Sequence, residues 1–551
     1  MKKLVQSLIT AVGLLSVSLS SCYKDKSTLP SNPIPDVVID TVGIAKEQFV
    51  DFQTHLIISP KPDPKFEDAD VSYKWQITAT TDQRSTDLET IGTDLRLDYI
   101  ATKPISSKPY YLFLTITDNK HGGIEYIYSW PLTIRGSYIS GLVVADTKDG
   151  GAHTDLTYIK DQSVSIKYKG DQVWFRDILG STPEGAIPGR ANKITYAYWG
   201  YATYFGRDSY LWVSTDDGKL YKYNTKDFSL AGNLSDDRIA IYKSGDIRVK
   251  NHFSAGEYYF LDTTDGIYKI SHRSRNAETV FSVPESVLAG TKISNNIVGV
   301  SGNRQNNDGF AIYYDEGKEA ILGFAKYQSY SFNKETFAAN EQFDPGKLPN
   351  RTAIAADISD DGKFGRILLK NNSTDNYELY IVKMHEKERK DNAGKVIQHE
   401  EMACAQSKYS ISPDGKSILD EAKSVFFSKK YNLLYAVTKD KIYAFTFIGT
   451  SQEIKPSGIL YEVNAGEVIS NAKLFIQGEY NFEPTLVGGS LLPELKYNCM
   501  ALILGIQKGK DGLVRILPID PNFATSGILL RDKASDYTGF GTILDVTPIG
   551  E

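Results

Sequence analysis

Cysteine is scarce in this chain: its 551 residues include three, at Cys22, Cys404 and Cys499. Three thiols are too few for the disulfide framework of a small secreted domain, and they lack the paired spacing of a structural zinc site. A single bridge between Cys404 and Cys499 is one alternative, and two buried free thiols are the alternative we favour. The fold must therefore depend on an apolar core.

An excess of positive charge and the common catalytic motifs are also missing. The 62 Lys and Arg residues against 68 Asp and Glu give a formal net charge of -6, which leaves no broad basic field to neutralise nucleic acid phosphates. H-E-x-x-H, G-x-S-x-G, Walker and G-x-G-x-x-G patterns are absent from the sequence. This argues against a zinc protease, a common serine hydrolase and a nucleotide cofactor. We predict no cofactor, no metal ligands and no catalytic residue.

The N-terminus has the order of a secretion signal. Lys2 and Lys3 precede an apolar run over residues 4–19, which is shorter than the roughly 20 residues that span a bilayer. The run ends in the tetrad 19–22, LSSC, which resembles the lipobox of bacterial lipoproteins. The resemblance implies a signal peptide over residues 1–21 and an acylated thiol at Cys22, whose two or three chains would anchor the protein stably to a membrane. The alternative is a plain secretion signal cut near Ser21.

The next residues divide into a tether and a first folded domain. Residues 22–36 are polar and rich in Pro and Ser, which is typical of an extended linker. From residue 37 to 135, short runs alternate apolar and polar residues with period two, as strands do. Trp75, with Tyr73 and Ile77 on its face, is the predicted core residue of a β-sandwich, and Leu112, Leu114 and Ile116 are predicted to share one buried face.

Residues 136–551 repeat a strand, a turn with Asp, Gly or Lys, and a second strand, at intervals of about 40 to 50 residues. The seven clearest hairpins span residues 140–159, 210–224, 258–271, 309–324, 365–384, 432–447 and 500–519. Long amphipathic helices are almost absent, so this spacing favours radial blades over one large sandwich. We predict an all-β protein, with an Ig/PKD-like β-sandwich followed by a β-propeller of six to eight blades, seven preferred. Residues 539–549 are predicted to complete the first blade, because a ring hides its strand edges only by closing.

Two local motifs resemble propeller turns. Residues 214–221, STDDGKLY, resemble the Asp-box hairpin of propeller glycosidases, and residues 412–416, SPDGK, resemble a turn of bacterial propeller repeats. Both are predicted to stabilise turns and to carry no chemistry.

The order of parts resembles a bacterial family, the PKD-like lipoproteins. Tyr73-Lys74-Trp75 and the run from Leu114 to Asp118 match the Y-x-W strand and L-x-I-T-D turn of PKD-like domains. The resemblance implies an outer-membrane anchor, display on the cell surface, and a place beside a transporter that imports oligosaccharides or peptides. It supplies no catalytic residues.

Acidic residues in the turns leave an enzymatic alternative open. Glycosidases need only two carboxylates about 5 to 10 Å apart. The candidates are Asp146, Asp149, Asp216, Asp217, Asp360 and Asp361. All are predicted to lie in turns and to hydrogen-bond their own backbone. The oxygen-rich stretches 262–265 and 357–361 are alternatives for a structural calcium ion, although they lack the twelve-residue loop pattern.

An aromatic segment at residues 194–212 is the candidate binding platform. Aromatic faces bind sugar rings and peptide side chains, and tyrosine adds a hydroxyl. The candidate ligand-binding residues are Tyr196, Tyr198, Trp199, Tyr201 and Tyr204. Packing in the core of a blade is the alternative role for these aromatics.

These observations favour a non-catalytic, lipid-anchored binding protein for an oligosaccharide or a peptide. The first alternative is an extracellular propeller glycoside hydrolase or lyase with paired carboxylates. The second is a structural envelope protein that acts as an interaction scaffold.

Overall fold

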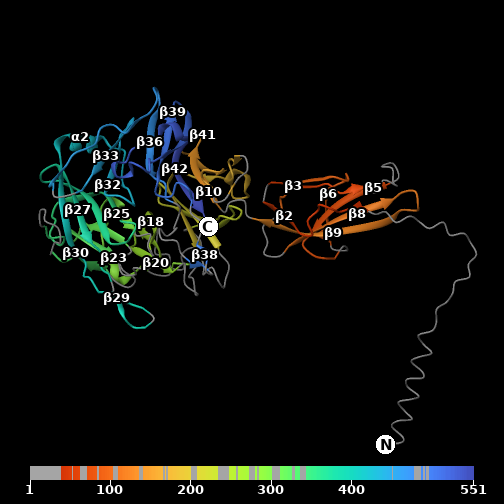
Figure 1. Ribbon diagram of the computed structural model, residues 1–551, viewed down its shortest axis with the longest axis horizontal. Coiled ribbons are helices and arrows are strands. Elements are labelled where there is room, and N and C mark those ends of the chain that lie inside the picture. The colour runs from red at the N-terminus through yellow and green to blue at the C-terminus, as the bar shows by residue number, and fades with distance from the viewer. Residues whose placement is uncertain are drawn as a thin grey trace, which may run out of the picture. The chain divides into compact units, whose positions relative to one another are not determined.

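The computed structural model shows an almost entirely β protein (Figure 1). It describes residues 39–51, 54–62, 71–82, 86–103, 109–135, 140–165, 168, 172–199, 208–233, 247–255, 258–271, 280–281, 284–300, 311–324, 329–334, 343–386, 388–391, 393–448, 451–476, 486–487, 490–491 and 495–550. The predicted signal peptide, Cys22 and the tether lie outside the described residues. The chain divides into two compact units, with Ile134 the last residue of the first and the second continuing from Arg135; Asp51, Thr102 and Lys103 group with the second unit.

In its described residues, the first unit contains three sheets. The largest has the order β2-β9-β8-β5-β6. Its strands are β2 (Gln48–Asp51), β9 (Ile124–Arg135), β8 (Tyr110–Asp118), β5 (Val71–Thr78) and β6 (Glu89–Gly92). The two-stranded sheets pair β3 (His55–Ile58) with β7 (Leu97–Ile100), and β1 (Ile39–Asp40) with β4 (Lys61–Pro62).

Trp75 fills the core of the first unit, as predicted. Its side chain is 0% exposed, and its Nε1 donates a hydrogen bond to the carbonyl oxygen of Asp94 at 3.0 Å. Leu112, Leu114 and Ile116 are also fully buried, which confirms their shared face. Phe113 and Thr115, on the opposite face of β8, are 4% and 5% exposed, so this strand is buried on both faces.

In the described residues, the second unit contains seven mostly antiparallel sheets of three to five strands and two two-stranded sheets. Sheet 1 has β42 (Thr542–Gly550), β10 (Ser140–Thr147), β11 (His153–Lys160), β12 (Val173–Phe175) and β13 (Ile187–Pro188). Sheet 2 has β14 (Ala191–Trp199), β15 (Asp208–Thr215), β16 (Leu220–Asn224) and β17 (Leu230–Asn233). Sheet 3 has β18 (Val249–Ala255), β19 (Tyr258–Thr263) and β20 (Ile267–Ser271). Sheet 4 has β21 (Gly299–Val300), β22 (Ala311–Asp315), β23 (Ala320–Phe324) and β24 (Ser329–Ser331).

Three further sheets follow in chain order. Sheet 5 has β25 (Arg351–Ile358), β26 (Phe364–Asn371), β27 (Asn376–Lys383), β30 (Cys404–Ile411) and the parallel β34 (Glu453–Ile454). Sheet 6 has β31 (Ser424–Phe427), β32 (Leu433–Val437), β33 (Lys441–Thr446) and β35 (Tyr461–Glu462). Sheet 7 has β36 (Val468–Leu474), β39 (Ala501–Lys508), β40 (Asp511–Pro518) and β41 (Ser535–Phe540). Each of the seven sheets contains one of the predicted hairpins, so all seven are confirmed.

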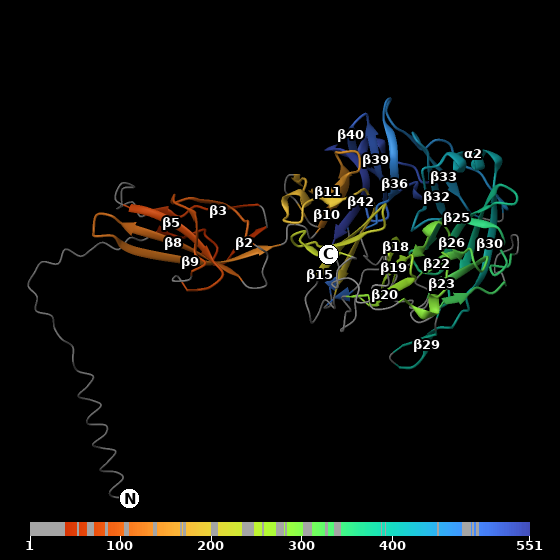
Figure 2. The same ribbon diagram turned by 180° about the vertical axis from the view of Figure 1, so that it is seen from behind.

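The sheets form a closed ring. β42, from the C-terminus, pairs with β10 of sheet 1, and Figure 2 shows the two strands side by side. This confirms the predicted closure. Seven apolar clusters in the described part of this unit each join two neighbouring sheets, and one of them joins sheet 7 to sheet 1. A cyclic row of antiparallel sheets with a core between each pair is the arrangement of a β-propeller.

The hairpin turns share a polar motif. Thr147, Thr215 and Thr438 each donate a side-chain hydrogen bond to the aspartate two residues later, which fixes the turn. The predicted Asp-box hairpin is among them, since β15 and β16 flank it and Gly218 has a φ of +81°.

The predicted turn at residues 412–416 was wrong. Ser412 is the N-cap of a helix, α2 (Pro413–Glu421), and its side chain accepts a hydrogen bond from the Gly415 backbone N–H at 3.3 Å. The same residues suit a helix start, because serine caps the first turn, proline fits its first position and Asp414 adds a favourable negative charge.

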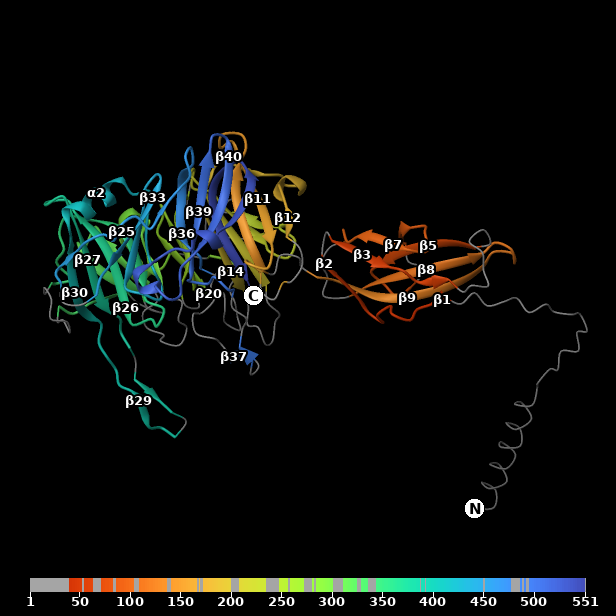
Figure 3. The ribbon, with the colours of Figure 1, turned by 45° about the horizontal axis from the view of Figure 1, so that its top comes forward.

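Two insertions project from one side of the second unit. One pairs β28 (Arg389–Lys390) with β29 (Val396–Gln398), and the other pairs β37 (Leu486–Val487) with β38 (Ser490–Leu491). Figure 3 shows β29 and β37 on the same side. Cys404 and Cys499 are buried and form no disulfide with each other, in agreement with the favoured alternative.

Candidate functional site

We call the strand that is named first in each sheet above its first strand, so that β42 is the first strand of sheet 1. First strands of neighbouring sheets contact one another, which places them nearest the axis of the ring. Contacts of this kind join β42 to β14, β14 to β18, β25 to β31, β31 to β36 and β36 to β42. Five of these strands have a β-bulge, at Asn192, Lys250, Ile354, Ser470 and Leu544. A bulge turns the following side chain away from the regular pleat.

The bulges place polar side chains across the boundaries between sheets. Lys473 Nζ lies 2.5 Å from Asp545 Oδ1, and Asn471 Nδ2 donates to the Leu544 carbonyl oxygen at 2.9 Å. Lys193 Nζ donates to Asn251 Oδ1 at 2.7 Å. We call Lys193, Asn251, Asn471, Lys473 and Asp545 the axial cluster. It extends over four successive first strands, β36, β42, β14 and β18.

Electrostatics set the axial cluster apart from the surface. Burial lowers the pKa of Lys193 to about 8; the negative charge of Asp545 opposes this shift, and the positive charge of Lys473 adds to it. The three charged groups therefore act on one another within a partly desolvated space. This is the environment in which an ionic contact with a ligand is strongest.

His252, next to Asn251, is a structural residue. It is 0% exposed, its Nδ1 lies 2.7 Å from the Tyr259 hydroxyl, and its Nε2 lies 2.9 Å from Ser214 Oγ. Burial and the charge of Lys193 hold its pKa well below the usual value, so the ring is neutral near pH 7. Both nitrogens are engaged in the core between sheets 2 and 3.

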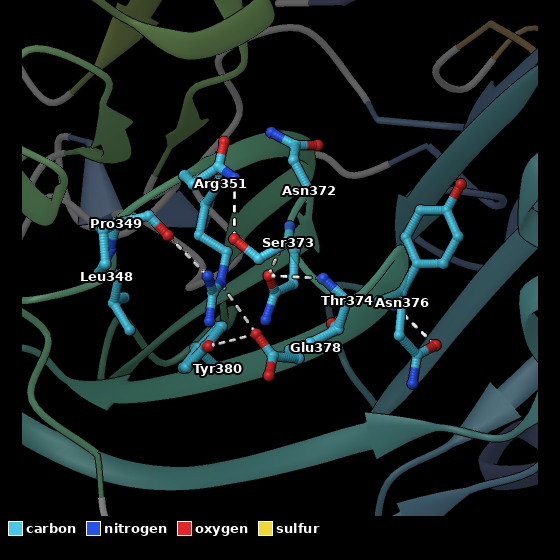
Figure 4. Close-up of polar contacts among 12 residues, drawn as sticks. Leu348, Pro349, Arg351, Asn372, Ser373, Thr374, Asn376, Glu378 and Tyr380 are labelled. Atoms are coloured by element: carbon cyan, nitrogen blue, oxygen red, sulfur yellow. Dashed lines mark hydrogen bonds and ion pairs between the residues drawn. The ribbon is translucent and has the colours of Figure 1, made fainter.

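A second polar cluster lies within sheet 5. Glu378 Oε2 accepts hydrogen bonds from Arg351 Nε at 2.9 Å and from the Tyr380 hydroxyl at 2.7 Å (Figure 4). Lys408 Nζ lies 3.3 Å from Glu378 Oε1. Burial opposes ionisation of Glu378, but the hydrogen bond from Tyr380 and the charges of Lys408 and Arg351 hold its pKa below the usual value. Both carboxylate oxygens are occupied, so this cluster serves the stability of the sheet.

A third polar cluster connects sheets 4, 5 and 6. Asp357 accepts a hydrogen bond from Arg366 Nη2 at 2.7 Å, and its other oxygen contacts Lys429 Nζ. Lys429 also donates to the carbonyl oxygens of Val300 at 2.7 Å and Ile358 at 3.1 Å. Cationic side chains contact both oxygens of Asp357, which disfavours a calcium ion at this residue of the stretch 357–361.

The predicted aromatic platform is only partly described. Tyr196 is 2% exposed and belongs to the apolar cluster between sheets 1 and 2, so it packs in the core instead of facing a ligand. Tyr198 and Trp199 continue β14 opposite β15, but their side chains are outside the described part of the structure, as are Tyr201 and Tyr204. For these four residues a binding role stays a prediction.

The turn carboxylates mostly stabilise their own turns, as predicted. Asp149 accepts hydrogen bonds from the backbone N–H of His153 at 3.0 Å and from its Nδ1 at 2.7 Å, and Asp361 accepts one from Ser359 Oγ at 2.6 Å. Asp146 was placed wrongly in a turn. It is buried in β10, where it accepts a hydrogen bond from the Gly541 N–H at 2.7 Å, and burial raises its pKa.

The stretch 262–265 also has a role without metal. The Tyr268 hydroxyl donates to Asp265 at 2.6 Å, and burial raises the pKa of Asp262 to about 6. In the described part of the chain, no group of three or more His, Cys, Asp or Glu side chains could hold a metal ion.

Sequence reasoning missed the axial cluster. Its signal is a charged residue in the middle of an otherwise apolar strand, as in ANKIT (191–195), NAKLF (471–475) and TILDV (542–546). Such residues are rare in buried strands unless they are paired.

No protein-family model and no curated protein matches the sequence. Solved structures resemble it distantly. A candidate 6-phosphogluconolactonase from Bacteroides uniformis is 11% identical, with a TM-score of 0.39 over 75% of this chain and 100% of its own. BamB from Moraxella catarrhalis is 12% identical, with a TM-score of 0.26 over 72% and 88%. AztD from Citrobacter koseri is 13% identical, with a TM-score of 0.27 over 71% and 100%. Because these similarities are so distant, we assign the fold from the strand order alone.

No helix in the described ranges is long and apolar enough to cross a membrane.

Proposed function

We propose that this chain is an exported, lipid-anchored binding protein that holds its ligand at the axial cluster of a seven-bladed β-propeller. Each of the seven sheets of the second unit is one blade. Cys22 carries the acyl chains, residues 22–36 act as a tether, and a PKD-like sandwich within residues 37–135 acts as a spacer. The resemblance to PKD-like lipoproteins supports an outer-membrane location beside an uptake transporter, and an oligosaccharide or a peptide as ligand.

The observation that supports this proposal most is the position of the axial cluster. Burying charged side chains in a strand near the centre of a fold costs free energy. A cluster of such residues there therefore indicates a role in function. Here two lysines and an aspartate lie on first strands that paired sheets hold rigidly on both sides. A rigid frame that presents charged groups at fixed positions suits recognition, because little entropy is lost when the ligand binds.

The acidic residues of the first strands favour binding over hydrolysis. Asp357 and Asp545 are the acidic residues on these strands as the structure describes them. Asp357 is paired with Arg366 and Lys429, and Asp545 with Lys473. A carboxylate pair that hydrolyses glycosides needs one protonated acid beside its substrate. Two separately ion-paired carboxylates do not meet that need.

The binding function is tested with the full chain carrying Cys22→Ser, which prevents acylation. The protein is screened against oligosaccharides and peptides, and retention and product release are measured in the same samples. We expect retention without product, lost in Lys193→Met and kept in Lys219→Met, whose exposed side chain pairs with Asp217 on a turn. Product release would contradict the proposal and favour the glycosidase alternative. If the protein retains no oligosaccharide and no peptide, the scaffold alternative is favoured.

The anchor is tested separately in cells that express the full chain. We expect an alkyne analogue of palmitate to label the protein. The label should be lost in Cys22→Ser and kept in Cys404→Ser, a change at a buried thiol. Equal labelling of both variants would contradict lipidation at Cys22.

A further inference from the structure

The axial cluster has more positive than negative charge. Lys193 and Lys473 each carry an ammonium group against the single carboxylate of Asp545, and the other members are amides. Neighbouring His252 adds no charge, because burial keeps it neutral. Counted as formal charges, two lysines against one aspartate leave the cluster one positive charge in excess.

Asp545 is already committed to other groups. Its Oδ1 accepts hydrogen bonds from Lys473 Nζ at 2.5 Å and from the Val546 N–H at 2.8 Å. Its Oδ2 accepts one from the Ile194 N–H at 2.8 Å. These contacts hold the carboxylate between β36 and β14. Its charge reaches Lys193 through space, but no hydrogen bond between the two is found in the described part of the chain.

Lys193 faces a neutral and fixed partner. Asn251 Oδ1 accepts from Lys193 Nζ and also from the His252 N–H, while Asn251 Nδ2 donates to the Asn296 carbonyl oxygen at 2.7 Å. The amide therefore cannot flip without losing these three contacts. An ammonium group has three protons, and a desolvated one is stabilised by further acceptors, above all charged ones.

We propose that the axial cluster binds an oxyanion, the carboxylate or phosphate group of a small ligand, between Lys193 and Lys473. The two lysines come from β14 and β36, the strands on either side of β42, and the positive charge of Lys473 acts on Lys193. Because this is the binding site of the proposed function, the inference names the ligand class of that same site. The ligand is then an acidic sugar, a peptide carboxylate or a phosphorylated molecule.

The test is titration calorimetry of the full chain carrying Cys22→Ser with phosphate, acetate and galacturonate. Sodium chloride keeps the ionic strength constant, because screening alone alters weak ionic binding. We expect saturable binding of at least one oxyanion. Lys193→Met and Lys473→Met should each weaken it by tenfold or more, whereas Lys219→Met should change it by less than twofold.

A gain of affinity separates binding from folding. Asp545→Asn removes the competing negative charge and keeps an acceptor oxygen, so we expect it to bind the same oxyanion at least threefold more tightly. A variant damaged in folding would not bind the oxyanion more tightly. The affinity of Asp545→Asn therefore tests the proposal even if either lysine variant fails to fold. The inference is overturned if no oxyanion saturates, if affinity is unchanged in both lysine variants, or if Asp545→Asn binds equally or more weakly.

The two proposals can fail separately. In one outcome, oxyanion binding depends on Lys193 and the ligand screen releases product. This result would support the oxyanion site and contradict the non-catalytic function. In the other outcome, the protein retains a ligand, and neither added phosphate nor Lys473→Met reduces this retention. This result would support the binding function and contradict the oxyanion site.

Discussion

Lys473 Nζ lies 2.5 Å from Asp545 Oδ1, and this ion pair joins β36 of the last sheet to β42, the strand that closes the ring. The same carboxylate accepts the N–H of Ile194 in β14. One side chain therefore connects three first strands at the point where the two ends of the propeller meet.

Asp545→Ala should destabilise the ring. The substitution removes the partner of Lys473 and leaves the N–H groups of Ile194 and Val546 without their acceptor, which costs about 3 kcal/mol for a partly buried charged group. Urea unfolding of the full chain measures the loss. Asp511→Ala, at the exposed first residue of β40, is the control and should change stability by less than about 0.5 kcal/mol. Equal losses in the two variants would contradict the role of Asp545.

Lys429→Met should destabilise the protein more strongly. Lys429 is buried and joins the Val300 and Ile358 carbonyl oxygens to Asp357, so its removal leaves three acceptors with fewer partners. Breaking a buried ion pair from one side costs about 3–5 kcal/mol. Thermal unfolding compares it with Lys430→Met, the exposed neighbour, for which we expect little change. A small effect at Lys429 would show that the cluster is not a structural link.

Asp262→Asn should stabilise the protein at neutral pH and have no such effect in acid. Burial raises the pKa of Asp262 to about 6 from 3.8, so the folded state keeps a proton that the unfolded state releases as the pH rises from about 4 to 6. Stability therefore falls over that range, by about 3 kcal/mol for roughly two pKa units. The asparagine has no proton to release and avoids the loss.

The measurement is the free energy of unfolding of wild type and Asp262→Asn at pH 4 and pH 7.5. We expect equal values at pH 4 and a more stable variant at pH 7.5. Asp511→Asn, at the exposed first residue of β40, is the matched control and should show no difference at either pH. A benefit of the same size at both values would mean that ionisation of Asp262 is not its cause.

Ser412→Ala should weaken the start of α2. The serine side chain accepts the Gly415 N–H at 3.3 Å, and loss of an N-cap costs about 0.5–2 kcal/mol. Ser417→Ala is the control, because Ser417 is exposed within the same helix and alanine has the higher helix propensity. Hydrogen exchange of the helix amides should rise in the first variant only. Faster exchange in both variants would contradict a capping role for Ser412.

The sequence by itself determined the local part of this fold. Strands such as β15 and β16 follow from alternation with period two, and their turn follows from Thr215, Asp217 and Gly218, because these interactions lie within a few residues of one another. Closure by residues 539–549 could also be predicted, since an exposed strand edge in a ring needs a partner. The motif at residues 412–416 could not be decided locally, because Ser, Pro and Asp suit both a turn and a helix start.

Only the tertiary structure decided where the charged residues meet. Lys193 and Asp545 are more than 350 residues apart in the chain, and the ring brings them together because β42 returns to sheet 1 beside β14. The pattern of each strand gives the face of a residue but not the neighbour opposite it. Burial was decided in the same way: Tyr196 has the sequence setting of a binding aromatic, yet packing between sheets 1 and 2 removes it from solvent.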